Sequence, residues 1–281
     1  MAKITVKDIL SFKGVKKISM LTAYDYQFAR IFDQAKIDIL LVGDSMGMVV
    51  YGETSTLPVT LTQTIFHTQA VSRGATSHSL VIGDMPFLSF GVSIEKSVQN
   101  AGRIMKEGGA EAVKLEGGIS RVEEIKAMKN IGIPVMGHIG LTPQSVHEFG
   151  GHKVQGKTAD IADKIIDEAK ALDKAGVFAI VLEAIPWQIA GEITKNVSVP
   201  TIGIGAGPNC DGHVLVGQDM LGLTPLPHPR FVKAYINLDE QISNATVNFK
   251  KDIEDGTYPG PEHQYSMPND EYEKWKKSKN L

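Results

Sequence analysis

The chain has 281 residues, of which 42% are hydrophobic and 22% charged, and its formal net charge is −3 at pH 7. This composition is ample for one large core, and the length suits a single α/β barrel, which commonly spans about 250 residues. A pI near 6.2 and the lack of a basic stripe argue against a nucleic-acid partner.

Cysteine content and apolar patterning bear on the cellular compartment. Cys210 is the only cysteine, which excludes an intramolecular disulfide framework and a multi-cysteine zinc site. Residues 1–8 show no signal-peptide pattern, and no uninterrupted apolar stretch reaches the length of a transmembrane helix. We therefore expect a cytoplasmic protein without a membrane partner.

Short apolar runs, typical of strands buried on both faces, alternate with helical patterns along the chain. The central example is residues 39–45, an apolar run that stops abruptly at Asp44. Similar runs predict eight strands, at residues 17–21, 39–44, 80–84, 112–116, 133–138, 179–183, 200–205 and 214–216. Helices are predicted up to residue 35, at residues 62–73, 93–106, 120–129 and 159–175, and from residue 186 onward.

Strands that alternate with helices predict a parallel sheet with right-handed crossovers. Eight strands close a barrel, so the predicted fold class is α/β, a (β/α)8 TIM barrel in a single domain. The eighth strand is the weakest, and an open doubly wound sheet is the alternative. The predicted catalytic domain covers residues 1–265 and includes a C-terminal helical extension at residues 231–253. Residues 266–281 form a polar tail that we expect to be loosely ordered.

Four predicted strands end in an acid: Asp44, Asp84, Glu116 and Glu183. In a parallel barrel, catalytic groups collect at the carboxyl ends of the strands. Asp44 and Asp84 end consecutive strands, and two close carboxylates either share a proton or hold a cation. A hard ion such as Mg²⁺ suits these oxygen ligands, and Glu116 is a third candidate. The alternative for any single acid is a helix cap or an ion pair with a lysine.

Lys114, His138 and Glu183 are candidates for contact with a substrate. Lys114 and Glu116 are two residues apart, so both point to the same face of a strand. An inward lysine needs an anion, which is either a substrate carboxylate or Glu116, and a Schiff-base role is a third possibility. His138 could orient or protonate a substrate oxygen, or simply be a hydrogen-bonded histidine. The apolar residues after Glu183 would make it a better general base, and the alternative is a helix cap before Pro186.

The glycine-rich residues 203–207, Gly-Ile-Gly-Ala-Gly, look like a phosphate loop. A dinucleotide fingerprint follows the first strand of a βαβ unit and has an acid about 20 residues on. Here the glycines follow the seventh predicted strand, and no clear helix comes next. A phosphate site and a tight turn that lets backbone approach the site both stay open. Cys210 and His213 are close in sequence, which alone does not predict a nucleophile–base pair.

Taken together, these segments resemble the ketopantoate hydroxymethyltransferase family over residues 5–265. The most specific stretches are residues 137–145 and 153–156. The full set of matching stretches is TAYDY at 22–26, VGDSMG at 42–47, STLPVT at 55–60, DMPF at 84–87, VKLEGG at 113–118, GHIGLTPQS at 137–145, GG at 150–151, KVQG at 153–156, LE at 182–183, IGIGAG at 202–207 and YPG at 258–260.

The resemblance implies a magnesium-dependent barrel enzyme of pantothenate and coenzyme A biosynthesis. Such an enzyme transfers a hydroxymethyl group from its co-substrate, 5,10-methylenetetrahydrofolate, to 3-methyl-2-oxobutanoate. The product is 2-dehydropantoate, and the reaction passes through a Mg-stabilised enolate. The resemblance also implies a ring-like homo-oligomer, often a decamer, to which the helical segment after Pro229 could contribute contacts.

The family's pattern assigns roles to the strand-end residues. The metal positions match Asp44, Asp84 and Glu116. The substrate-binding positions match Asp44, Ser45, Asp84 and Lys114. The catalytic positions match Glu183, as proton acceptor, and His138, near the substrate. Gln218 stands where some members have histidine, so a contact of that histidine with folate or water is not carried over.

This assignment agrees with the chemistry of 2-oxo acids. A 2-oxo acid can chelate Mg²⁺ through its carboxylate and keto oxygens, which acidifies the C3 hydrogen. Glu183 would remove that proton, and the metal with Lys114 would hold the enolate charge.

Two rival functions stay open. A barrel of the phosphoenolpyruvate mutase and isocitrate lyase type would act on 2-oxo acids without folate, although its Lys-Lys-Cys-Gly-His-type loop is missing from this sequence. A non-catalytic metabolite-binding barrel would bind Mg²⁺ and the oxo acid without proton exchange.

Overall fold

The computed structural model describes residues 3–148, 150–151, 153–225, 227 and 229–280. Contacts divide the chain into two compact units, Met1–Ala234 and Tyr235–Leu281. The division that the sequence suggests, a catalytic domain at residues 1–265 and a tail at 266–281, stays a prediction. In the described part of the chain, no helix is long and apolar enough to cross a membrane.

The first unit is a closed barrel of eight parallel strands, in which each strand pairs with the next and β8 closes against β1. The predicted (β/α)8 barrel is therefore confirmed, and the alternative of an open sheet is wrong. The strands are β1 Ile18–Thr22, β2 Ile39–Val42, β3 Leu80–Asp84, β4 Ala112–Glu116, β5 Val135–Gly140, β6 Ala179–Glu183, β7 Thr201–Ile204 and β8 Gly212–Leu215.

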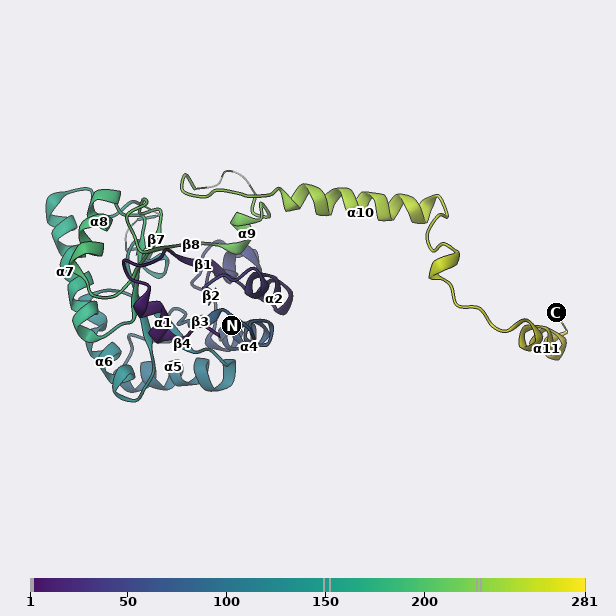
Figure 1. Cartoon of the computed structure of the whole chain (residues 1–281), viewed down its shortest axis with the longest axis horizontal. Helices are drawn as coiled ribbons and strands as arrows, with labels where there is room; N and C mark the ends of the chain where they lie inside the picture. Colours follow the sequence, from purple (N-terminus) through teal and green to yellow (C-terminus); the bar gives the residue numbers. More distant parts are fainter. Residues whose placement is uncertain (1–2, 149, 152, 226, 228, 281) are drawn as a thin grey trace. The chain divides into compact units, whose positions relative to one another are not determined.

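Most helices of this unit connect consecutive strands and lie around the barrel (Figure 1). In the first unit they are α1 Val6–Ser11, α2 Tyr26–Gln34, α3 Met46–Val49, α4 Leu61–Gly74, α5 Ile94–Gly108, α6 Val122–Asn130, α7 Ala159–Ala175, α8 Trp187–Asn196 and α9 Gly217–Met220, with 3₁₀ turns at Ile119–Arg121 and Pro143–Ser145. Polar caps fix where several helices begin: the side chains of Asp25, Thr60 and Ser93 each accept a hydrogen bond from a backbone N–H in the first turn.

The second unit contains α10 Leu238–Glu254, a 3₁₀ turn at Pro261–His263 and α11 Asn269–Lys279. The helix predicted to begin at residue 231 begins at Leu238 instead, because Asn237 caps it by accepting from the backbone N–H of Glu240. Within the predicted polar tail, the residues of α11 form a helix with no buried residue, and the expectation that the tail is loosely ordered stays a prediction. The eighth strand also differs from its predicted range, since it begins at Gly212 and pairs there with Ile18 of β1.

Alternate strand residues face the barrel interior, because side chains on a strand point to opposite sides in turn. The interior layers nearest the amino ends of the strands are apolar and belong to one buried cluster, which includes Ile18, Ile39, Leu80, Ala112, Ala179 and Ile202. Further along the same strands, the interior positions become polar and charged. This change in the interior, at the carboxyl ends of the strands, creates the candidate site.

Candidate active site

The interior positions at the carboxyl ends of the strands bring the predicted acids together. Asp84 comes two residues after the interior Ile82 of β3, so it also faces inward. On β4, Lys114 and Glu116 share that orientation. The strand register places Lys114 beside Asp84 and Glu116 beside His138 of β5. Four predicted site residues from three consecutive strands therefore meet at one end of the barrel.

Lys114 is paired with Asp84 rather than with Glu116. Its Nζ donates to Oδ1 of Asp84 at 2.7 Å, and both side chains are buried. Burial alone would lower the pKa of Lys114, but the charges of Asp84, Glu116 and Asp44 outweigh it and raise the pKa above its ordinary value. A lysine that stays protonated suits the binding of an anion, whereas a Schiff base requires the neutral amine.

Asp44 and Glu116 are the two buried acids of the site that do not accept the hydrogen bond of Lys114, which goes to Asp84. Burial and the neighbouring charge of Asp84 raise the pKa of Asp44 to about 7. Burial likewise raises the pKa of Glu116 well above its usual range. Three carboxylates thus face a single lysine. Protons or a cation would relieve their mutual repulsion.

The carboxylates of Asp44, Asp84 and Glu116, with the hydroxyl of Ser45 nearby, offer oxygen donors, which suit a hard ion such as Mg²⁺. Within the described residues, no group of three His, Cys, Asp or Glu side chains is arranged to hold a metal by itself. Magnesium commonly takes only one or two protein carboxylates and fills its other positions with water or substrate oxygens. The close carboxylates of Asp44 and Asp84 fit that mode of binding.

His138 lies between two carboxylates. Its Nδ1 is 3.6 Å from Oε1 of Glu116, and its Nε2 is 3.2 Å from Oε2 of Glu183. In the described part of the chain, neither ring nitrogen makes a well-aligned hydrogen bond. Burial and the charge of Lys114 lower the pKa of His138, so the neutral ring is favoured. A neutral imidazole has one N–H to donate, to a carboxylate or to a bound substrate.

All the residues predicted for the site line one cavity of about 1180 Å³. They are Asp44, Ser45, Asp84, Lys114, Glu116, His138 and Glu183. Ala184, Ile185, Pro186 and Trp187 line the wall next to Glu183, so the apolar surroundings expected for this carboxylate are present. The cavity has a charged floor inside the barrel and a mostly apolar mouth.

Gln144 is a site residue that the sequence analysis does not identify. Its side-chain Nε2 donates to Oδ2 of Asp44 and to the carbonyl of Met85, both at 2.9 Å, and its backbone N–H donates to Oε2 of Glu116 at 3.0 Å. The residue is 7% exposed. It therefore orients two carboxylates whose strands are not neighbours. Its only signal in the sequence is its place in the specific stretch at residues 137–145.

Tyr24 is a second residue that sequence reasoning missed. Its hydroxyl lies 2.8 Å from Oγ of Ser45. Burial raises the pKa of Tyr24, so the phenol keeps its proton. The tyrosine thus lies behind Ser45 and fixes the direction of that hydroxyl, and its signal is the TAYDY stretch after the first strand.

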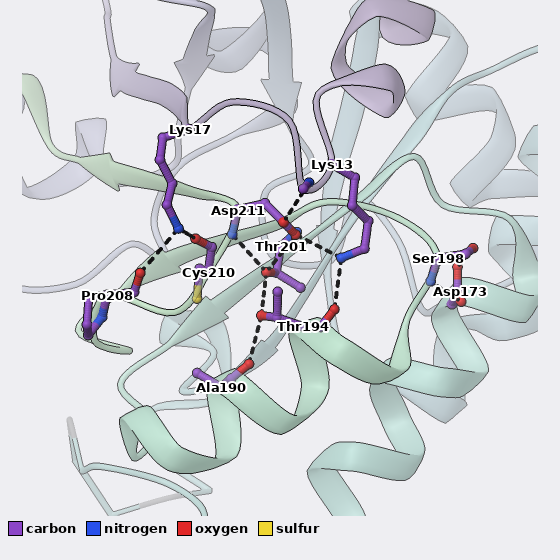
Figure 2. Close-up of polar contacts among 11 residues, drawn as sticks. Lys13, Lys17, Asp173, Ala190, Thr194, Ser198, Thr201, Pro208, Cys210 and Asp211 are labelled. Carbon is purple, nitrogen blue, oxygen red and sulfur yellow. Dashed lines mark hydrogen bonds and ion pairs between the residues drawn. The ribbon is translucent and has the colours of Figure 1, made fainter.

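Cys210 lies at the opposite, amino end of the barrel. Figure 2 shows it near Thr201, the first residue of β7, and near Thr194 of α8. Burial raises the pKa of its thiol, which disfavours the thiolate that nucleophilic attack requires. The surroundings of Cys210 thus give no support to nucleophilic catalysis, and it takes no part in the cavity.

The chain matches the family model of ketopantoate hydroxymethyltransferase over residues 3–261. It belongs to this family. A 3-methyl-2-oxobutanoate hydroxymethyltransferase of Clostridioides difficile (strain 630) is 52% identical over 270 residues, 95% of this chain and 98% of that protein. One of Syntrophobacter fumaroxidans is 53% identical over 265 residues, 94% of each chain. The protein is accordingly an enzyme of the ketopantoate hydroxymethyltransferase family, a transferase.

Solved structures of other enzymes share the fold at low identity. Phosphoenolpyruvate phosphomutase from Streptomyces platensis subsp. rosaceus has a TM-score of 0.60 at 13% identity, over 98% of this chain and 99% of that one. Phosphonopyruvate hydrolase in complex with oxalate and Mg²⁺ has a TM-score of 0.57 at 12% identity, with the same coverage. These likenesses establish the barrel architecture alone. The family match is what separates the chain from the mutase and lyase rival.

Proposed function

We propose that this enzyme transfers a hydroxymethyl group from 5,10-methylenetetrahydrofolate to 3-methyl-2-oxobutanoate, giving 2-dehydropantoate for pantothenate and coenzyme A biosynthesis. The observation that carries the proposal is that one cavity holds a charged lysine among carboxylates and, beside it, a His138–Glu183 pair. The first arrangement suits the binding of a 2-oxo acid, and the second suits removal of its proton. The names of the relatives support the same reaction.

Asp44 and Asp84 would hold a Mg²⁺ ion, with Glu116 as the third carboxylate of the site. The support for this assignment is electrostatic. An anionic oxo acid would be repelled by three ionised carboxylates that face one lysine, and a bound cation would offset their charge without the need to protonate them. When bound, the ion would draw electrons from the oxo acid's oxygens and so acidify its C3 hydrogen.

Lys114 and Ser45 would contact the substrate from the floor of the cavity. Lys114 keeps its positive charge, so it can attract the carboxylate of the oxo acid and offset the charge that develops on the enolate oxygen. The Ser45 hydroxyl is held in place by Tyr24, at 2.8 Å, before any substrate arrives. Such orientation in advance lowers the entropy lost when substrate binds.

Glu183 would accept the C3 proton. Its side chain is 16% exposed, whereas that of His138 is 3% exposed, so Glu183 is the more accessible of the two from the cavity. His138, in its neutral form, would donate its one N–H toward Glu183 or toward a substrate oxygen. A hydrogen bond to Glu183 would hold that carboxylate in the direction needed to reach C3.

The transfer then needs no oxidant or reductant, because the donated carbon keeps the oxidation level of formaldehyde. A bond forms between C3 of the oxo acid and the donated carbon, and the two bonds from that carbon to the folate nitrogens break. Water supplies the new hydroxyl group. The C3 proton and the remaining proton of the water end on the two nitrogens of tetrahydrofolate.

The enzyme would act in the cytoplasm as a homo-oligomer. The support for self-association is the surface of α10, on which no residue is buried although Ile242, Phe249 and Ile253 lie on one side of the helix. Exposed apolar side chains that share a helix face commonly mark a protein–protein contact.

Exchange of the C3 proton of 3-methyl-2-oxobutanoate in D₂O, followed by NMR without folate, tests the proposal. Exchange should require Mg²⁺ and stop when a chelator is added. Glu183→Gln should slow it by about 10²- to 10⁴-fold, the usual contribution of a general base. Glu192→Gln, at an exposed position of α8, is the matched control and should exchange at the wild-type rate.

Wild-type exchange that persists in Glu183→Gln would refute the general-base assignment. Binding of the oxo acid with Mg²⁺ but without exchange, with or without tetrahydrofolate, would instead favour the non-catalytic binding protein. A 2-dehydropantoate signal that appears only when 5,10-methylenetetrahydrofolate is added would identify the one-carbon donor.

A further inference from the structure

The glycine-rich turn after β7 is not a phosphate loop, because β8 rather than a helix follows it. Two of its glycines have positive φ, +63° at Gly205 and +76° at Gly207, a conformation that residues with side chains rarely adopt. The turn therefore requires glycine for its backbone shape. The atoms packed against each glycine are a second reason why the turn requires glycine.

Each of these two glycines packs closely against an aromatic residue. A Cβ at Gly205 would come within 2.9 Å of ring atom Cδ1 of Phe231, and a Cβ at Gly207 would come within 2.2 Å of Cβ of Trp187. Real side-chain atoms do not approach so closely, so a larger residue would displace the Phe231 ring at the first position and the base of the Trp187 side chain at the second. The turn thus provides the close-packed backbone surface against which Phe231 and Trp187 lie.

Both aromatic side chains line the mouth of the active-site cavity and remain open to it. Trp187 is 54% exposed and Phe231 is 39% exposed, although both occupy a concave surface. Met48 and Val154 line the same mouth and are also exposed. Apolar and aromatic side chains that face a cavity above a polar floor are typical of a ligand subsite.

Arg230 adds a positive charge to this mouth. It precedes Phe231 in the chain and lines the same cavity. Within the part of the chain that the structure describes, Arg230 has no hydrogen bond or ion pair. An arginine without an acidic partner at the rim of a cavity is available to a carboxylate of a ligand.

We propose that Trp187 and Phe231, seated on the Gly205–Gly207 turn, form the subsite for the aromatic rings of the one-carbon donor, with Arg230 facing its carboxylates. The inference rests on the proposed function, since it assumes that the donor is a folate. A reduced folate carries a pterin ring, a benzoyl ring and an anionic glutamate. At the mouth of the cavity, Trp187 and Phe231 offer aromatic faces for the two rings, and Arg230 offers a positive charge for the glutamate. The charged floor below would hold the oxo acid.

Binding of tetrahydrofolate, measured by calorimetry, tests the subsite. Trp187→Leu and Phe231→Leu should each raise the dissociation constant about tenfold, on the scale known for stacked aromatic contacts. Arg230→Gln should weaken the binding of tetrahydrofolate and leave the binding of a pterin without glutamate unchanged. Trp275→Leu on α11 and Phe66→Leu on α4 are matched controls, because both side chains are exposed and neither lines the cavity.

A loss of affinity in a variant could also come from a folding defect, so tryptophan fluorescence tests contact with the ligand directly. The chain has two tryptophans, so Trp187 is the only one left in Trp275→Leu. Added tetrahydrofolate should quench its emission directly. Gly207→Ala in that background should diminish the quenching, because the added methyl group displaces Trp187.

The Mg²⁺-dependent exchange of the oxo acid's C3 proton separates the two ideas. It needs no donor, so it is measured in the wild type beside the tetrahydrofolate affinity of the variants. Unchanged affinity in both variants, with normal exchange in the wild type, would overturn the subsite alone. A wild type that binds tetrahydrofolate but neither exchanges the proton nor makes product would overturn the proposed function, while the quenching of Trp187 would still decide the subsite.

Discussion

Buried carboxylates lie at both ends of the barrel, and they differ in the number of hydrogen-bond donors that the protein supplies to them. At the amino end, Asp33 accepts from the backbone N–H groups of Ser77, His78 and Ser79 and from the hydroxyl of Ser77, at 2.5 to 2.9 Å. Burial alone would raise the pKa of Asp33, but these donors outweigh it and lower the pKa to about 2.

Asp211 follows the same pattern at that end (Figure 2). Its Oδ2 accepts from Nζ of Lys13 and from the backbone N–H of Thr201, both at 2.9 Å, and its Oδ1 accepts from the backbone of Gly14. The donors again outweigh burial, so the pKa of Asp211 falls below its ordinary value. These contacts tie the first residue of β7 and the residue before β8 to the segment before β1. Their role is to hold the fold together.

At the carboxyl end, Asp44 accepts one amide hydrogen bond, from Gln144, and the carboxylate of Asp84 lies close to it, while the charge of Lys114 offsets only part of the effect. Burial and that like charge raise its pKa to about 7. An aspartate of similar burial thus has a raised pKa at one end and a lowered pKa at the other. Where the protein does not supply partners for a buried acid, a ligand is expected to supply them. Keeping such an acid buried without partners lowers the stability of the folded protein, as is usual for active sites.

After Glu183→Gln, the largest effect expected on activity comes from Asp44→Asn. Removing this charge should slow Mg²⁺-dependent exchange of the oxo acid by about 10²- to 10³-fold, the scale seen when a group that stabilises a transition-state charge is lost. The metal-free variant should unfold at the same temperature as the wild type or a higher one, because a charge that burial disfavours is gone. Calorimetric melting and NMR exchange measure the two effects. A lower melting temperature would mean that Asp44 is a structural acid like Asp33.

A smaller loss is expected from Gln144→Met, which keeps the shape of the side chain and the backbone N–H to Glu116 but removes the donor to Asp44. Residues that orient metal ligands typically change affinity by about 10- to 100-fold when mutated. We expect Mn²⁺, titrated by EPR in place of Mg²⁺, to bind more weakly by this factor. Gln69→Met, which removes a surface amide on α4, is the matched control. Equal Mn²⁺ affinity in both variants would show that Gln144 orients no metal ligand.

The acids of the site were predictable because they depend on local pattern. An apolar run that stops at Asp44, Asp84 or Glu116 marks both a buried strand and its carboxyl end, and the alternation of side chains along a strand fixes which residues face inward. The closed barrel followed from the count of such runs. The exact pairing did not, since Lys114 could have joined Glu116 until the register placed it beside Asp84.

Gln144 and Tyr24 could not be predicted from such patterns. Gln144 belongs to a 3₁₀ turn, and its partner Asp44 is 100 residues away, so only the closed barrel brings them together. The glycine-rich turn was ambiguous for the same reason. Its glycines are explained by Trp187 and Phe231, which come from segments before and after it in the chain.

The smallest effect on activity, and the clearest on stability, should come from Asp33→Asn. Asparagine can offer only one acceptor oxygen to the four donors around Asp33, and its NH₂ group would face the others. A pKa lowered from 3.8 to about 2 corresponds to about 2 kcal/mol of stability at pH 7. Because the folded-state pKa is the lower one, this stability is present above about pH 4 and is lost as the pH falls toward 2.

Urea unfolding measures this effect in Asp33→Asn against the exposed control Asp167→Asn. The free energies of unfolding of the two variants should differ at pH 7, and this gap should close in acid, with C3 exchange unchanged. A gap that persists at low pH would assign the loss to packing instead of charge, and a loss of exchange would remove the distinction between the two ends of the barrel.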